Sequence, residues 1–157
     1  MQVSRHSYEE PKKIQLWKRK RKKRKSRKEF NREWKLIQSF VFHLADYLRD
    51  ELDLLPSVAL QKAWMTERLL EKLGKRKVSF MYRKDDQTMR SAVGTLCPEA
   101  SERLRHWLEE HSLKDAVGEI KQNNQDFPNH FVYWDEKVNG FRTFKAENLI
   151  WYDEDDE

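Results

Sequence analysis

Residues 12–28 restrict the fold of this chain more than any other segment, because they contain twelve basic side chains and no acidic one. Eight of these cations are consecutive, at positions 18–25. A block of like charges repels itself into an extended chain unless a partner supplies counter-charge. The residues that follow this block must therefore build the folded part of the molecule. We expect residues 1–28 to be a disordered basic arm.

The net charge of +5 conceals how unevenly the charges are distributed. The five residues 153–157 are all acidic and form an acidic tail, whereas residues 29–152 contain 19 basic and 20 acidic side chains. This nearly neutral body also holds five of the six tryptophans, enough for one modest core. A length of 157 residues is typical of a single domain, which disfavours an enzyme with two large lobes.

Composition excludes several classes of chemistry. The glycines stand singly at Gly74, Gly94, Gly118 and Gly140, so they form neither a Walker loop nor a dinucleotide-binding fingerprint. The single cysteine, Cys97, precludes an intrachain disulfide. The histidines lack the spacing of metal ligands, and no apolar run resembles a signal peptide or a membrane span. We therefore expect a cytoplasmic protein without a catalytic centre, metal or cofactor.

Hydrophobic periodicity predicts a two-helix segment over residues 29–74. Apolar residues recur at steps of four and three over residues 30–55, which indicates one face of a helix. The same spacing fits a short two-helix heptad seam, although packing on the protein's own core is favoured. Pro56 and Ser57 predict a helix stop and a new N-cap, before a second helix that ends at a left-handed Gly74.

The pattern changes to short strands after Gly74. Val78, Phe80 and Tyr82 alternate with more polar residues, as in a half-buried strand. Further strands are predicted at 89–96, 130–135, 140–145 and 149–152, with a helical insertion at about 98–122. Short strands joined by tight turns favour a small β-barrel, here over residues 75–152. The expected fold class is therefore α+β.

Four short motifs carry a family resemblance. They are the pair Ala63 and Trp64, V-x-F-x-Y at 78–82, R-x-A-x-G-T-L at 90–96, and F-R-x-F-x-x-E-N-L-I at 141–150. Their order resembles the WYL_2 family, Sm-like SH3-type β-barrel proteins of Bacteroidetes and their phages. The resemblance implies N-terminal helices packed on a small SH3-like (Sm-like) barrel, and it brings no catalytic residues. By analogy of fold it also implies nucleic-acid or nucleotide ligands.

The basic arm favours DNA or RNA as a partner, because neutralising phosphates releases condensed counterions. Such contacts position a protein without reading bases. A second basic group flanks the first strand and would extend the phosphate track if it lay on one rim of the barrel. The predicted nucleic-acid-binding residues are Lys18, Arg19, Lys20, Arg21, Lys22, Lys23, Arg24, Lys25, Arg27, Lys28, Lys75, Arg76, Lys77, Arg83, Lys84 and Arg90.

Other interpretations of these charges stay open. The arm is also compatible with a solubilising tail, an anchor to an anionic membrane surface, or a nuclear-localisation-like patch. The second basic group is scattered along the sequence, which favours isolated surface charge over a single track. The acidic tail either folds back on the arm and competes with nucleic acid, or is an unstructured solubilising end. Trp17, Trp134 and Trp151 are the candidates for stacking on unpaired bases.

Two functional classes follow from the sequence. The first is a non-catalytic nucleic-acid-binding accessory or regulatory protein, in which the arm binds phosphates and the barrel is the structured platform. The alternative is a phage or mobile-element module that docks on another protein through helix 30–55 or the barrel. Such a module would modulate host machinery or join an assembly.

Overall fold

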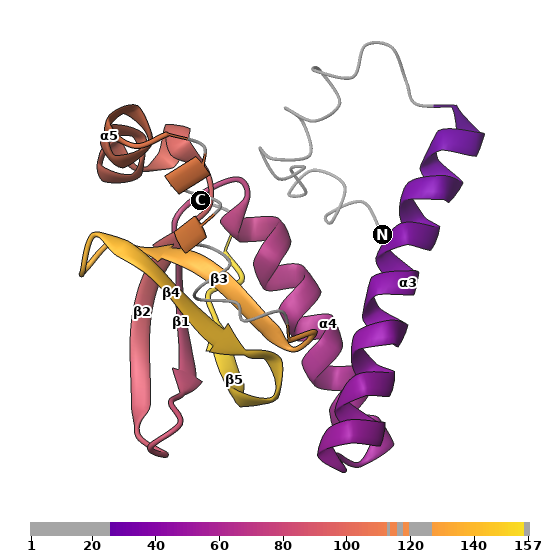
Figure 1. Ribbon diagram of the computed structural model, residues 1–157. Helices are drawn as coiled ribbons and strands as arrows, with labels where there is room; N and C mark the ends of the chain where they lie inside the picture. Colours follow the sequence, from indigo (N-terminus) through magenta and orange to yellow (C-terminus); the bar gives the residue numbers. More distant parts are fainter. Residues whose placement is uncertain (1–25, 113, 116–117, 120–126, 156–157) are drawn as a thin grey trace, which may run out of the picture. The chain divides into compact units, whose positions relative to one another are not determined.

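The computed structural model describes residues 26–112, 114–115, 118–119 and 127–155 (Figure 1). It has the predicted α+β class, with α-helices and one antiparallel sheet. The elements are, in chain order, α3 (Arg27–Leu52), α4 (Pro56–Leu73), β1 (Val78–Arg83), β2 (Met89–Thr95), the 3-10 helix η1 (Pro98–Ala100), α5 (Glu102–Glu110), β3 (His130–Asp135), β4 (Gly140–Lys145), the 3-10 helix η2 (Ala146–Asn148) and β5 (Leu149–Tyr152).

The chain divides into two compact units, Met1–Leu36 with Asp155–Glu157, and Ile37–Glu154. The described part of the first unit is residue 155 and residues 26–36, which include the start of α3. Most of the predicted disordered arm lies outside the described residues. Residues 26–28 are the exception. Ser26 precedes α3, and Arg27 and Lys28 belong to its first turn.

The sheet belongs to the second unit and confirms the predicted strands. Its order is β4-β3-β2-β1-β5, and every neighbouring pair is antiparallel. Val78, Phe80 and Tyr82 are buried, as the alternation along β1 predicted. Gly94 in β2 is needed where β2 meets β3, because a Cβ there would lie 2.5 Å from a ring carbon of Tyr133.

The core has two adjoining clusters. In the first, Leu69 and Leu73 of α4 pack with the inner side chains of the sheet, among them Phe80 and Phe144. In the second, Val41, Leu44 and Leu48 of α3 pack with Ala59 and Ala63 of α4 and with Ala146 of η2. This part of the predicted heptad stripe is therefore buried in the protein's own core.

The helix boundaries differ from the prediction for local steric reasons. Helix α4 begins at Pro56, the first helical position, which suits proline because an N–H there has no helical acceptor. Leu55, and not Ser57, is therefore the N-cap. Gly74 has a right-handed φ of −72°, so the left-handed cap predicted there is wrong.

The predicted helical insertion is confirmed over its described first half. η1 is followed by α5, where the Ser101 side chain accepts a hydrogen bond from the Leu104 N–H as an N-cap. Helical residues recur at 114–115 and 118–119, and the rest of 98–122 lies outside the described residues. Within the described part of the chain, no helix combines the length and the apolarity that a bilayer span requires.

Candidate nucleic-acid interface

The second basic group of the sequence does not lie on one rim. Lys75, Arg76 and Lys77 precede β1, whereas Arg83 and Lys84 end it. Six residues of extended chain separate the two sets by about 20 Å. Arg90 lies with the second set, because it pairs with Tyr82 across the β1–β2 hairpin. The second basic group therefore forms two separate sets at opposite ends of this hairpin and not one phosphate track.

The group at the turn of the hairpin borders a cleft of about 590 Å³, here called the hairpin-tip cleft. Its walls come from the end of α3, the β1–β2 hairpin, the start of β3, the end of β4 and η2. Four cations, two acids and two amides are among its lining residues, namely Arg83, Lys84, Arg90, Lys145, Asp85, Glu147, Asn129 and Asn148. These charged side chains make the lining net positive.

The acids of the β1–β2 turn neutralise only part of this charge. Asp86 accepts hydrogen bonds from the backbone and hydroxyl of Thr88, so its main role is to form the turn. Asp85 pairs with Lys145 at 2.8 Å, and Lys84 lies 3.8 Å from Asp86. Because both acids lie in an exposed turn, these ion pairs are weak and an incoming phosphate can replace them.

Arg83 and Lys62 add to the positive field on this side of the sheet. Arg83 is exposed, and no hydrogen-bond or ion-pair partner for it occurs among the described residues. Burial lowers the pKa of the Lys62 ammonium, and the nearby charge of Arg83 lowers it further. Lys62 donates a hydrogen bond to the carbonyl oxygen of Leu149. Arg83 is therefore the cation of the cleft that a ligand can engage without breaking a contact.

A buried amide lies in the same cleft. Asn129 is 4% exposed and donates from Nδ2 to both carboxylate oxygens of Glu147, at 2.9 and 3.1 Å. This pair fixes which end of the amide is nitrogen, because only nitrogen can donate to a carboxylate. The Oδ1 atom of Asn129 is buried and accepts no hydrogen bond from the described residues. An unsatisfied buried acceptor is costly and needs an explanation.

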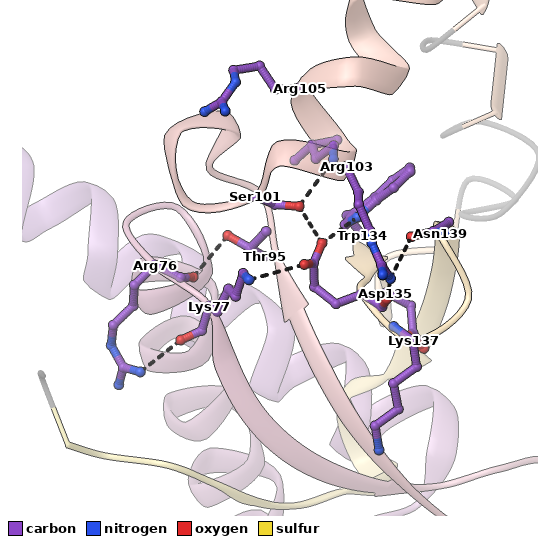
Figure 2. Close-up of polar contacts among 12 residues, drawn as sticks. Arg76, Lys77, Thr95, Ser101, Arg103, Arg105, Trp134, Asp135, Lys137 and Asn139 are labelled. Carbon is purple, nitrogen blue, oxygen red and sulfur yellow. Dashed lines mark hydrogen bonds and ion pairs between the residues drawn. The ribbon is translucent and has the colours of Figure 1, made fainter.

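At the opposite end, polar side chains from several elements meet at Glu136, and Figure 2 shows Lys77, Ser101, Arg103 and Trp134 close together there. Its carboxylate accepts hydrogen bonds from the Ser101 hydroxyl and, at 2.8 Å, from the Trp134 indole, and it pairs with Lys77 at 3.2 Å. Arg103 donates to the Glu136 carbonyl and to Asn139. We call Lys77, Ser101, Arg103, Trp134 and Glu136 the Glu136 cluster.

The charge of Glu136 is stabilised inside this cluster. Burial opposes the charge, but hydrogen bonds from Ser101, Lys77 and Trp134 outweigh it and lower the pKa of Glu136. Arg76 is also occupied, since it donates to the carbonyl oxygens of Lys77 and Asp153. The cluster thus ties α5, β3 and the start of β1 together, and most of its donors are already used.

A buried hydrogen-bond chain runs from the cleft into the sheet. Arg90 donates to the Tyr82 hydroxyl, which lies 2.8 Å from the hydroxyl of Tyr133. Tyr133 reaches Asp135, whose carboxylate also pairs with Arg142 at 3.2 Å. Burial raises the pKa of Tyr133, so this hydroxyl stays protonated. The chain positions Arg90 at the cleft.

The predicted stacking residues have different outcomes. Trp134 is 1% exposed, so the prediction that its ring is free to stack on a base is wrong. The cause is tertiary, because Trp107 and Phe141 cover the ring. Trp151 is 51% exposed at β5 and keeps a free ring surface. Trp17 lies outside the described residues.

Half of the predicted nucleic-acid-binding residues also lie outside the described part. These are Lys18, Arg19, Lys20, Arg21, Lys22, Lys23, Arg24 and Lys25. Sequence reasoning missed Asn129 and Lys145 in the cleft, and Arg103 at the other end. The only sequence feature that could have indicated these three residues is that each stands at or next to the end of a strand or helix. Glu147 lies in the motif at 141–150, and its carboxylate accepts hydrogen bonds from the side chain of Asn129.

The acidic tail is partly attached to the sheet. The Asp153 N–H donates to the carbonyl oxygen of Ser79, continuing the pairing of β5 with β1. Lys72 donates to the carbonyl oxygen of Glu154. Asp153 and Glu154 are therefore not a free end, and residues 156–157 lie outside the described residues.

Comparison with known proteins identifies the family to which this architecture belongs. No curated protein and no solved structure matches the chain. The family described as WYL_2, Sm-like SH3 beta-barrel fold, matches residues 66–150, more than half of the 157 residues. The matched segment begins in α4 and contains the strands β1 to β4 and the first half of β5. The chain with its antiparallel sheet of order β4-β3-β2-β1-β5 therefore belongs to the WYL_2 family of Sm-like SH3 β-barrels.

Proposed function

We propose that this protein is a non-catalytic nucleic-acid-binding accessory or regulatory factor of the cytoplasm. The observation that carries the proposal is the concentration of twelve cations, without an acid, in residues 12–28. Cations at such a density neutralise phosphates and release condensed counterions, which gives affinity without base specificity. Residues 12–28, here called the basic segment, supply most of the affinity, and the barrel supplies a structured platform.

The hairpin-tip cleft supports the second half of the proposal. Arg83, Lys84, Arg90 and Lys145 line it together with amides and aromatic rings. Clefts that combine cations with ring surfaces are typical of proteins that bind single-stranded nucleic acid. The Glu136 cluster offers a poorer surface, because its cations already bind protein groups.

The test is a titration of labelled duplex and single-stranded DNA and RNA with the full chain at two salt concentrations. Six to ten phosphate contacts would lower the affinity about 10³- to 10⁵-fold between about 50 and about 200 mM salt. A variant in which residues 18–25 are all glutamine should bind more weakly and with a much smaller salt slope. Salt-independent binding by the unmodified chain, or none, would contradict the proposal.

A matched control preserves the charge of the segment. Replacing Arg19, Arg21 and Arg24 by lysine leaves eight consecutive cations, so phosphate affinity and salt slope should stay close to those of the unmodified chain. A large loss in this control would mean that guanidinium groups make specific contacts there, beyond simple charge.

The alternative function is a protein-docking module, in a Bacteroidetes or phage setting that the motif resemblance supports. The observation that favours it is the exposure of large apolar side chains on α3, with Phe30 53%, Trp34 48%, Leu36 65% and Phe42 51% exposed. Exposed apolar groups of this size are typical of interaction surfaces. The titration separates the two functions, because a pure docking module gains nothing from low salt or from residues 18–25.

A further inference from the structure

The hairpin-tip cleft has the size and the chemistry of a site for one small ligand. Its volume of about 590 Å³ lies within the range of about 300–1,000 Å³ that is usual for small-molecule sites. Its lining includes the cations Arg83, Lys84 and Lys145 and the acceptors Asn129 and Glu147. A ligand that fits must therefore carry both an anionic group and hydrogen-bond donors.

The acceptors are arranged as a pair. Asn129 holds the Glu147 carboxylate with its Nδ2, and its own Oδ1 is buried without a donor among the described residues. Because one amide group carries both Nδ2 and Oδ1, the free Oδ1 lies close to the carboxylate oxygens. Glu147 keeps lone pairs that Asn129 does not use. Two neighbouring acceptors call for two neighbouring donors on the ligand.

Among the nucleobases, guanine offers two adjacent donors, the N1–H and the 2-amino group of its Watson–Crick edge. Adenine and cytosine each place a ring acceptor beside their amino group, and that acceptor would face the Glu147 carboxylate. Thymine and uracil place a single N–H between two carbonyl oxygens. Unpaired bases are read through this edge, whereas pairing hides it in a duplex.

The remaining parts of a nucleotide also find partners in the cleft. Phe127 is 47% exposed, and its ring centroid lies 4.8 Å from that of His130, which gives an aromatic surface for the base. Stacking on such a surface adds affinity for a base of any identity, because every base has a π-face. Arg83, which has no partner among the described residues, and Lys145 are positioned at the same cleft for a phosphate.

We infer that the hairpin-tip cleft binds one unpaired guanine nucleotide through Asn129 and Glu147. This inference rests on the proposed nucleic-acid-binding function and gives it base specificity. The basic segment would then bind any strand through its phosphates. The cleft would determine at which base of a single strand the barrel binds. Phosphate contacts alone confer no such selection.

The test compares single-stranded thymine oligonucleotides that differ at one central base, carrying guanine, hypoxanthine, adenine, cytosine or thymine. The full chain is titrated against each at about 200 mM salt, where phosphate contacts contribute less. We expect the guanine strand to bind about tenfold more tightly than the thymine strand. Hypoxanthine, which lacks only the 2-amino group, should lose most of this preference.

Two variants link the preference to the cleft. Glu147→Gln turns one acceptor into a donor and should abolish the preference for guanine, and Asn129→Ala should do the same. Glu109→Gln makes the same charge change on exposed α5 and should keep the preference. Circular dichroism verifies folding, and duplex binding at low salt should be similar in all variants. If a cleft variant fails to fold, the affinities of the unmodified chain for the five strands still show whether guanine is preferred.

The outcomes separate this inference from the proposed function. Equal affinity for all five strands, or a preference for another base, would overturn the guanine site while leaving salt-dependent binding by the basic segment intact. The same preference in Glu147→Gln and Asn129→Ala would also overturn it. No binding of any nucleic acid would overturn both.

Discussion

Cations gather at both ends of the β1–β2 hairpin, and the two ends use them differently. In the Glu136 cluster, Lys77 and Arg103 are bound to protein groups that join α5, β3 and β1. In the hairpin-tip cleft, Arg83 is exposed and has no partner within the described chain, and Lys145 pairs only with an exposed turn acid. Similar basic composition thus stabilises structure at one end and leaves charge for a ligand at the other. The difference comes from the acids that face the cations.

This comparison predicts that substitutions in the Glu136 cluster change stability, whereas those in the cleft change binding. The largest effect is expected for Trp134→Ala, which removes a fully buried indole and its hydrogen bond to Glu136. The free energy of unfolding should fall by about 3–5 kcal/mol, measured by urea denaturation.

Trp151→Ala is the matched control for this substitution. Because Trp151 is 51% exposed, the same change there should cost well under half as much. An equal loss of stability in the two variants would contradict the burial difference on which the comparison rests.

A smaller effect is expected for Glu136→Gln, which keeps an oxygen acceptor but removes the charge that Lys77 faces. Hydrogen bonds to a charged group contribute about 1.5–3 kcal/mol and neutral ones about 1, so the variant should lose about 1–2 kcal/mol at neutral pH. The folded-state pKa of Glu136 is lowered, so its contribution is present above its ordinary value of 4.5 and is lost as pH falls through the lower folded value.

The pH dependence provides the measurement. Urea denaturation curves for wild type and Glu136→Gln should converge as the pH falls below about 4.5 and should differ most near neutrality. A constant difference in unfolding free energy from pH 7 down to pH 3 would show that the carboxylate charge of Glu136 does not stabilise the cluster.

The smallest effect on stability is expected in the cleft. Arg83→Gln should change the free energy of unfolding by less than about 0.5 kcal/mol, because the side chain is exposed. Under the proposed function, it should nevertheless lower affinity for nucleic acid and reduce the magnitude of the salt slope by up to about 0.9 for duplex DNA.

Arg103→Gln is the matched control at the Glu136 cluster. It should leave the salt slope unchanged and reduce stability, because it removes hydrogen bonds to Glu136 and Asn139. If both arginine variants lowered the salt slope equally, the two ends would act as one phosphate track, and the comparison would fail.

Most of the fold could be predicted because its strands and turns are determined by patterns within short stretches of sequence. Alternation along residues 78–82 identified β1 with its buried face, and turn residues such as Asn139 marked the second hairpin. Asn139 adopts a left-handed φ of 55°, which asparagine tolerates better than most residues. Helix boundaries were less predictable, since Ser57 and Pro56 are both plausible starts until the cap geometry is seen.

The candidate site was far less predictable. Asn129 and Glu147 are 18 residues apart in the sequence, and neither has a pattern that indicates contact with the other. The cations were identified by type, but the sequence left open whether they share one rim. The structure answers this, because a strand separates its two ends by its full length. Trp134 was predicted to be exposed because alternation along a strand shows only which side chains share a face of the sheet. Alternation cannot show that α5 covers the face of Trp134 with Trp107.

Charge, periodicity and short motifs are local properties, and they were enough to establish the α+β class, the order of the strands along the chain and the WYL_2 barrel. Whether a given cation is available to a ligand depends on which acid lies opposite, and this is a property of three-dimensional packing. Lys77 and Arg83 flank the same strand and have similar chemistry. Only folding brings Glu136 next to Lys77, and only folding leaves Arg83 exposed beside a cleft.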